Sequence, residues 1–275
     1  MSNLSDKKIA FVGSGIIAGV MIDRLLNTGT VNPEGILTTD IRPARLEEVK
    51  QQYGVQVSAG NVDAARFGDI IFIAVPPNVV TTVLGELRGT LREDQIIISL
   101  AAAVPFAVME EVLGGALAIV RVIPNTPSLL GAGMNPHCLG AKVRPGQIDL
   151  LDELLAVFSA TIRLEEIQMN IATALTAVGP TYVFPVLKAL AETAARHGMP
   201  EDQAQMAAAQ TVLGAAQLVL ETGRKPDDLK MMICTRTIKE DGALPLFTDA
   251  VELAFAKISE SQRKLAEARQ SLKTA

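Results

Sequence analysis

The chain has 275 residues, of which 49% are hydrophobic and 20% are charged, and this composition indicates a globular protein of about two domains. Its formal net charge of −5 gives no reason to expect nucleic acid or an anionic membrane as a partner. The two cysteines, Cys138 and Cys234, lie far apart in the sequence and predict no disulfide framework, and the two histidines, His137 and His197, predict no metal site with them.

An apolar strand near the start of the chain runs into a glycine turn and then into an amphipathic helix. Residues 9–19 read IAFVGSGIIAG, and the helix is expected over 16–27. In a dinucleotide fingerprint Gly13 permits the tight turn, Gly15 lets the backbone approach a pyrophosphate, and the small Ala18 lets helix and strand pack closely. Glycine turns also occur for steric reasons alone, so this motif needs support from the rest of the chain.

A second predicted strand, residues 35–39, ends at Asp40. This is about the distance from the turn at which an acidic residue meets the ribose hydroxyls of NAD, although Asp40 can equally be a solvated loop carboxylate. Arg42 and Arg45 follow, and their guanidinium groups suit the 2′-phosphate of NADP. Asp40 favours NADH because it repels that phosphate, so the sequence leaves the choice between NADP and NAD open.

Strand and helix patterns alternate through the first half of the chain. Strands are expected at residues 55–57, 69–75, 95–100, 117–123 and 161–164, and helices at 44–53, 79–91 and 147–158. Continuous apolar runs such as 69–75 are typical of strands buried on both faces of a parallel sheet. The order predicts an α/β domain, a Rossmann-type doubly wound parallel sheet, over residues 1–165, with ligands outside the carboxyl ends of the strands.

Strand patterns end near residue 165, and the remainder predicts an all-α dimerisation domain over residues 166–275. Helices are expected over 167–197, with an interruption at Gly179-Pro180, and then over 200–220, 227–232 and from 246 toward 273. The second of these is apolar on all sides between Met206 and Leu220, and such a helix must be buried all round. A small helical domain cannot bury it alone, so we expect burial against another subunit.

Two apolar stretches invite a targeting or membrane interpretation. Lys7 and Lys8 precede an apolar run that resembles a secretory signal, but no A-x-A cleavage site follows it. The stretch 96–109 is too short to span a bilayer and contains Pro105. We therefore expect a soluble, cytoplasmic protein without a membrane partner.

Five further segments, taken together, are specific enough to identify a family. They are AVPPN at 74–78, SLAAA at 99–103, RVIPNTP at 121–127, TALTAVGPTY at 173–182 and QTVLGAA at 210–216. Together with the glycine turn, they make nearly the whole chain resemble the pyrroline-5-carboxylate reductase family. That family makes proline by NAD(P)H-dependent reduction of a cyclic imine, and its corresponding segments read AVKPQ, SIAAG, RVMPNTP, TALSGSGPAY and QTVxGAA.

The resemblance implies binding roles in the first domain. The pyrophosphate would be held by Gly13, Ser14, Gly15, Ile16 and Ile17. Asn61 would lie near the adenosine, beside Asp40 and Arg42, and the nicotinamide side would be lined by Val75, Pro77, Ala101 and Asn125. The resemblance also implies a small-molecule substrate and an intertwined homodimer, or a higher homo-oligomer, made by the helical domain.

The chain departs from the family on the substrate side. The family's VTSPGGTT motif is a glycine nest that holds the substrate carboxylate, and here the shorter ICTRTI at 233–238 lacks both glycines and the proline. Val178 also replaces a serine of the family. The substrate-binding candidates are Thr235, Arg236, Gly179 and Pro180, and the catalytic candidates are Thr237 and Thr176. Arg236 offers a guanidinium in place of the lost glycine nest.

Three functions remain open at this point. The first is an NAD(P)H-dependent reductase of a cyclic imine carboxylate, which in the family is pyrroline-5-carboxylate. The second is a related reductase with a different imine or carbonyl substrate, because a pocket that loses its polar partners rejects its old ligand. The third is a dinucleotide-binding protein without turnover. The first two need few titratable groups, since hydride transfer to a C=N carbon chiefly requires positioning.

Overall fold

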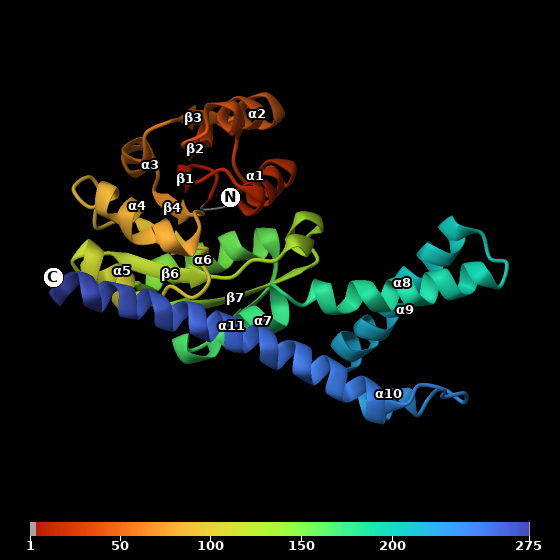
Figure 1. Ribbon diagram of the computed structural model, residues 1–275. Helices are drawn as coiled ribbons and strands as arrows, with labels where there is room; N and C mark the ends of the chain where they lie inside the picture. The colour runs from red at the N-terminus through yellow and green to blue at the C-terminus, as the bar shows by residue number, and fades with distance from the viewer. Residues whose placement is uncertain (1–3, 275) are drawn as a thin grey trace. The chain divides into compact units, whose positions relative to one another are not determined.

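The computed structural model describes residues 4–274, with side chains through residue 268. The chain divides at Val178 and again after Leu253 into two compact units. The larger unit, made of the described residues before Val178 and after Leu253, contains the whole β-sheet, and the smaller one, residues 178–253, is helical (Figure 1).

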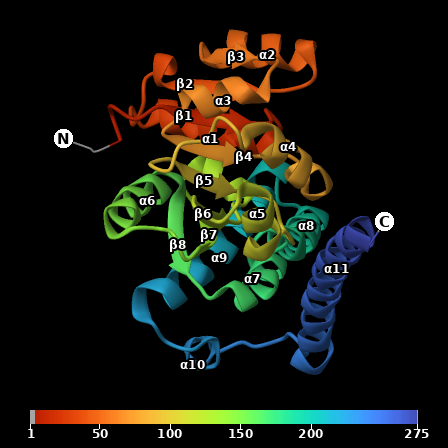
Figure 2. The same cartoon turned by 90° about the vertical axis from the view of Figure 1, so that its left-hand side faces the viewer.

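The sheet of the larger unit has eight strands in the order β3-β2-β1-β4-β5-β6-β7-β8, which can be followed from β3 downward in Figure 2. The strands are β1 (Ile9–Val12), β2 (Ile36–Thr39), β3 (Gln56–Ser58), β4 (Ile70–Ile73), β5 (Ile96–Ser99), β6 (Ala118–Val122), β7 (Gly133–Leu139) and β8 (Ser159–Arg163). Only the β6–β7 pairing is antiparallel. The predicted Rossmann-type, doubly wound sheet is confirmed.

Helices cover both faces of this sheet. One face carries α1 (Ile16–Asn27), α2 (Pro43–Tyr53) and α6 (Pro145–Phe158), and the other carries α3 (Asn61–Phe67), α4 (Val80–Leu87), α5 (Phe106–Leu113) and α7 (Met169–Thr176). Successive side chains of a strand point to opposite faces, so Phe11 and Val12 enter different core clusters and both are fully buried. The central strands β1 and β4 are therefore apolar throughout, which is the pattern that made them predictable.

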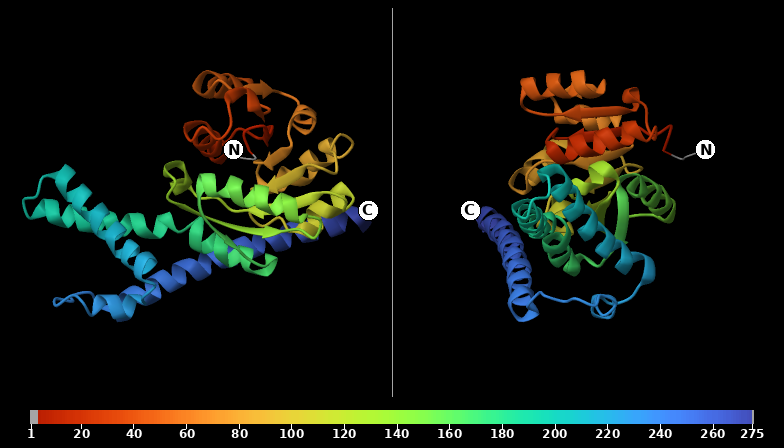
Figure 3. Two further views of the ribbon diagram at one scale, coloured as in Figure 1. Left: turned by 180° about the vertical axis from the view of Figure 1, so that it is seen from behind. Right: turned by 90° about the vertical axis from the view of Figure 1, so that its right-hand side faces the viewer.

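The smaller unit contains α8 (Pro180–Arg196), α9 (Glu201–Thr222), α10 (Pro226–Lys230) and the first part of α11 (Glu240–Thr274). The helices α8 and α9 pack side by side (Figure 3). Pro180 is the first residue of α8, where its missing N–H costs nothing, so the interruption predicted at Gly179-Pro180 separates α7 from α8. The helical nature of the second part of the chain is confirmed.

The compact units differ from the predicted division at residue 165. Glu166 accepts hydrogen bonds from Arg121 Nη1 at 2.8 Å and from the backbone N–H of Phe106 at 2.7 Å. Met169 of α7 is fully buried in the core of the larger unit, and Leu265 of α11 packs against the same core. The helical composition after residue 165 hides the fact that α7 and the end of α11 pack in the unit that contains the sheet.

The strand β7 was not predicted, and neither were α3 and α5. Pro136 removes a backbone donor, and Asn135 and His137 are polar, so the segment has the composition of a loop. In the structure Asn135 is buried with partners, because its side chain accepts from Ser128 Oγ at 3.0 Å and donates to the Ala160 carbonyl at 3.4 Å. Long-range hydrogen bonds make this polar segment a strand.

His137 of β7 is 2% exposed, and neither ring nitrogen has a hydrogen-bond partner of good geometry among the described residues. Burial lowers the pKa of His137 below its ordinary value of 6.5; the Asn135 backbone opposes this shift, and the charge of Arg163 adds to it. The fold therefore accommodates the neutral ring, whereas the unfolded chain takes up a proton at the ordinary pKa.

We expect the free energy of unfolding to fall as the pH drops below about 6.5, because the unfolded state then gains a proton that the folded state does not bind. The loss should continue until the pH reaches the lower pKa of the folded protein. His137→Leu removes the titrating ring and should make this part of the profile less steep. Urea unfolding of both proteins between about pH 7.5 and 5 tests this, and equal slopes would contradict it.

Candidate functional site

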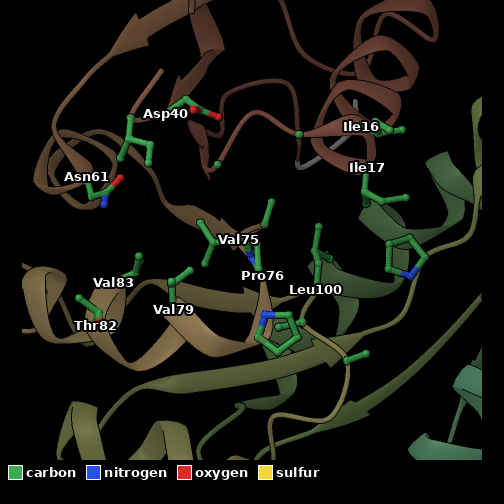
Figure 4. A pocket seen from close by; sticks show the side chains of 18 of the residues that line it. Ile16, Ile17, Asp40, Asn61, Val75, Pro76, Val79, Thr82, Val83 and Leu100 are labelled. Carbon is green, nitrogen blue, oxygen red and sulfur yellow. The ribbon is translucent and has the colours of Figure 1, made fainter. Parts of the chain in front are cut away.

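A pocket of ≈ 810 Å³ lies at the carboxyl ends of β1, β2, β4 and β5, in the larger unit. The strand order of the sheet reverses at β1, and open α/β sheets bind ligands at such a point. The volume falls within the range of about 300–1,000 Å³ that is usual for small-molecule sites. The pocket wall is mostly apolar, with Asp40 and Asn61 near one side and Ile17 and Leu100 on another (Figure 4).

The structure brings most of the predicted cofactor-binding residues to this pocket. Those that line it are Gly13, Gly15, Ile16, Ile17, Asp40, Arg42, Asn61, Val75, Pro77 and Ala101. Ser14 and Asn125 do not. Because Gly13 and Ala101 are 88 residues apart by their numbers (101 − 13), only the fold makes this one site.

The two glycines of the turn have different physical roles. Gly13 has a φ of 99°, and a Cβ added to it would lie 2.9 Å from the Ala74 carbonyl oxygen, so the fold itself requires glycine there. Gly15 precedes α1 in extended conformation, and no atom lies within 4 Å of the corresponding Cβ position. Gly15 therefore leaves open space in front of the helix N-terminus, where backbone N–H groups favour an anion.

Asp40 is a fixed carboxylate of the pocket wall, 9% exposed, and not a solvated loop residue. Its Oδ2 accepts from Ser14 Oγ at 2.8 Å and from Arg42 Nη2 at 3.0 Å, and its Oδ1 accepts from Arg42 Nε at 2.9 Å. Burial by itself raises the pKa of this carboxyl group, but the hydrogen bonds from Arg42 and Ser14 outweigh burial and hold the pKa well below its usual range.

Ser14 and Arg45 face away from the pocket wall. Ser14 is fully buried, and both its backbone N–H and its hydroxyl donate to Asp40, so it fixes that carboxylate and is absent from the pocket lining. Arg45 donates from Nε to the Ser14 carbonyl at 2.8 Å and from Nη1 to Glu48 at 3.0 Å. These partners keep the Arg45 side chain beside the glycine turn.

Asn61 lies between two other polar side chains. Its Oδ1 accepts from Thr39 Oγ1 at 2.8 Å, and its Nδ2 donates to Glu86 Oε2 at 2.8 Å. Glu86 of α4 lines the pocket, and sequence reasoning missed it because a glutamate in a helix is usually a solvated surface residue. Its position after the AVPPN segment was the only signal in the sequence.

Asn125 and Thr176 do not line the pocket, and both have hydrogen-bond partners within the larger unit. Asn125 Nδ2 donates to the Thr176 carbonyl at 3.1 Å, and its Oδ1 accepts from the Met134 N–H at 3.1 Å. Asn125 thus ties the end of α7 to the sheet. The Thr176 hydroxyl donates to the Ala172 carbonyl, and the residues of this segment that line the pocket are Thr173 and Ala177.

The other substrate-side candidates belong to the smaller unit, and none of them lines the pocket: Gly179, Pro180, Thr235, Arg236 and Thr237. The last three are exposed in the segment between α10 and α11. Arg236 Nη1 lies 2.9 Å from Met231 Sδ, and it makes no ion pair with any residue that the structure describes. Its guanidinium is thus free to meet an anion.

Two family models match the chain. The model described as NADP oxidoreductase, coenzyme F420-dependent, matches residues 8–103, which include the glycine turn and most of the pocket wall. The model described as pyrroline-5-carboxylate reductase dimerisation matches residues 166–264.

Relatives match over nearly the full length of the chain. The pyrroline-5-carboxylate reductase of Methanosarcina acetivorans is 30% identical over 270 residues, which cover 95% of this chain and 100% of that protein. The pyrroline-5-carboxylate reductase of Escherichia coli strain K12 is 32% identical over 269 residues, which cover 94% and 98%.

Solved structures agree with these matches. The pyrroline-5-carboxylate reductase of Coxiella burnetii superposes with a TM-score of 0.80 at 30% identity and covers 93% of this chain and 98% of its own. The NADP-bound pyrroline carboxylate reductase of Plasmodium falciparum has the same fold, with a TM-score of 0.83 at 23% identity and coverage of 94% and 100%.

Proposed function

The chain belongs to the pyrroline-5-carboxylate reductase family, and from this premise we propose that it uses NAD(P)H to reduce the C=N bond of pyrroline-5-carboxylate, which yields proline. The observation that carries the proposal is the pocket at the carboxyl ends of β1, β2, β4 and β5, because it lies in a chain that matches these reductases almost end to end. The family model that matches residues 8–103 is likewise described as an NADP oxidoreductase, which agrees with a nicotinamide cofactor.

The pocket fits a nicotinamide dinucleotide. The open space at Gly15, in front of the α1 N-terminus, suits a pyrophosphate, and the volume of ≈ 810 Å³ suits a ligand of this kind. Gly13, Gly15, Ile16 and Ile17 would hold the pyrophosphate. Asp40, Arg42 and Asn61 would surround the adenosine, and Val75, Pro77 and Ala101 would line the nicotinamide side.

Bound NAD(P)H supplies a hydride, which adds to the imine carbon while the nitrogen takes a proton, so that the C=N bond becomes a C–N bond. The apolar residues Val75, Pro77 and Leu100 would give the nicotinamide an apolar wall that orients planar groups. In this proposal Thr237 supplies a hydrogen bond to the imine nitrogen, and Arg236 binds the substrate carboxylate. Among the residues that the structure describes, Asp40, Arg42 and Glu86 are the charged ones that line the pocket.

The experiment that tests this function follows the oxidation of NADPH and NADH with pyrroline-5-carboxylate and with a few other cyclic imines. Turnover of pyrroline-5-carboxylate supports the proposal. Turnover of the other imines alone would favour a related reductase, for which the altered segment at 233–238 is the specific observation. Nucleotide binding without any turnover would indicate a dinucleotide-binding protein, and the proposed reaction would then be wrong.

Arg236→Ala should raise the KM for a carboxylate substrate. The expected loss of binding free energy is about 1.5–3 kcal/mol, the contribution of a charged hydrogen bond. Nucleotide affinity should stay unchanged. Thr237→Val should instead lower kcat, since a hydroxyl near the nitrogen matters most as the proton arrives. Steady-state kinetics check both, with Arg224→Ala as the control because Arg224 also lies near a methionine sulfur in the same unit. If Arg236→Ala and Thr237→Val match the parent, the segment at 233–238 has no part in the chemistry.

We further propose a soluble, cytoplasmic homodimer or larger assembly held by the helical part of the chain. Met206, Leu213 and Leu220 of α9 are exposed in a single chain, and because they recur every seventh residue they form an apolar stripe along the helix. Such a contiguous apolar surface indicates an interaction site. Residues 166–196 are also long and apolar enough to cross a membrane, but α7 in this stretch packs in the larger unit. The dimerisation model over residues 166–264 favours a second subunit as the cover.

We expect the purified protein to elute as a dimer or a larger species at low micromolar concentration. Size-exclusion chromatography with light scattering measures this directly. Leu213→Lys should weaken the assembly, because it would bury an unpaired charge between subunits, whereas Glu221→Lys is a charge change at the exposed end of the same helix. A parent that is a stable monomer would contradict this assembly.

A further inference from the structure

We propose that the pocket selects NADH over NADPH, because two carboxylates, Asp40 and Glu86, line its adenosine side and both arginines near Asp40 are already held by acidic partners. The adenosine side is the part of the pocket that is lined by Asp40, Ile41, Arg42, Asn61 and Glu86. This inference rests on the proposed function and names the cofactor of that site.

Asp40 cannot turn away from the pocket. Its carboxylate accepts hydrogen bonds from the backbone N–H and hydroxyl of Ser14, which is itself fully buried. It also accepts from the backbone N–H and the guanidinium of Arg42. A carboxylate held by four groups of the protein keeps its charge and its place when a ligand enters.

Arg42 and Arg45, which the sequence suggested for the 2′-phosphate of NADP, are both occupied by other partners. The Arg42 guanidinium makes a two-pronged ion pair with Asp40, so its charge is largely cancelled within the pocket wall. Arg45 lies outside the pocket lining, with its guanidinium on Glu48 and on the Ser14 carbonyl. To bind a phosphate, either arginine would have to leave an acidic partner, and Arg42 would leave Asp40 beside the phosphate.

Glu86 adds a second carboxylate from the side of α4, where it accepts a hydrogen bond from Asn61 Nδ2. Asp40, Glu86 and Arg42 are the charged residues of the pocket lining, and they sum to −1 (two carboxylates and one guanidinium). A phosphate monoester carries about −1.5 to −2 charges at pH 7. Asp40 is buried, so its charge is little screened and repels the 2′-phosphate of NADPH, and the exposed Glu86 adds a weaker repulsion of the same sign.

The ribose of NADH meets no such repulsion. Its hydroxyl groups are donors, and a buried carboxylate at the end of β2 is their usual acceptor in this type of fold. The partner of Asp40 that can make room is Arg42, whose side chain is 62% exposed. When ribose hydroxyls replace that guanidinium on Asp40, Ser14 still holds the carboxylate in place.

The test measures the Kd of NADH and of NADPH by fluorescence titration of the purified protein, so it does not depend on turnover. We expect the parent to bind NADH more tightly, with a Kd ratio on the order of tenfold or more. Asp40→Asn keeps an oxygen for the Ser14 donors, removes the charge and releases Arg42, so the ratio should fall about tenfold or reverse. Glu86→Gln, which keeps an acceptor for Asn61, should lower the ratio by a smaller factor.

Glu47→Gln is the matched control, because Glu47 is an exposed glutamate of α2 outside the pocket lining and should leave the ratio unchanged. Glu86→Gln keeps the test decisive if Asp40→Asn does not fold. A parent that binds NADPH as tightly as NADH, or a ratio that neither variant changes, would overturn this inference alone. A parent that binds neither nucleotide would overturn the proposed function as well.

Discussion

Gly15→Val is expected to abolish the binding of both NADH and NADPH while the protein stays folded. No atom lies within 4 Å of a Cβ at this position and the backbone is extended there, so the fold has room for the valine. The new side chain would occupy the space in front of the α1 N-terminus where the pyrophosphate would lie. We expect the Kd to rise on the order of 100-fold or more, which corresponds to about 2.7 kcal/mol.

Fluorescence titration measures this loss, and thermal unfolding shows whether the fold is intact. Gly85→Val is the control, since Gly85 also has open space at its Cβ position but lies outside the pocket lining. Gly13→Ala should behave differently and destabilise the protein, because of the positive φ and the contact with the Ala74 carbonyl. If Gly15→Val binds the nucleotide like the parent, the cofactor site lies elsewhere.

Glu166→Ala is expected to lower the free energy of unfolding by about 3 kcal/mol. This value is near the lower end of the losses that are usual when one partner of a buried ion pair is removed, because the Glu166 side chain is 36% exposed. The guanidinium of Arg121 is buried and would lose its only carboxylate partner among the described residues. The backbone N–H of Phe106, at the start of α5, would lose its acceptor in the same step. One substitution therefore removes contacts to β6 and to α5.

Urea unfolding measures this loss against two comparisons. Asp152→Ala breaks the exposed pair with Arg163 and should cost under about 1 kcal/mol. Arg121→Met combined with Glu166→Ala should recover much of the loss, because no unpaired charge then stays buried. A Glu166→Ala protein as stable as Asp152→Ala would show that water reaches Arg121 and that the pair is not buried in solution.

The candidate site residues fall into two groups: those that act through their own backbone, and those whose side chains bond to residues distant in the sequence. The glycine turn was predictable because Gly13 and Gly15 act through their own backbone and the adjacent helix N-terminus. Ser14 and Asn125 were assigned to the cofactor, yet their side chains bond to Asp40 and to the Thr176 carbonyl. A short polar side chain in a motif gives no sign of which way it points.

The sequence alone determined the doubly wound sheet, the helical second part and the glycine turn, because strand alternation, helix periodicity and turn chemistry are local properties of the chain. Other residues of the pocket wall, such as Asn61 and Ala101, were expected there only from the family resemblance. Tertiary structure alone decided what depends on distant partners. It made the polar segment of β7 a strand, and it packed α7 in the unit that contains the sheet. It also paired Asp40 with Arg42 and brought Glu86 to the pocket, since hydrogen bonds and charges act through space, whatever the separation in sequence.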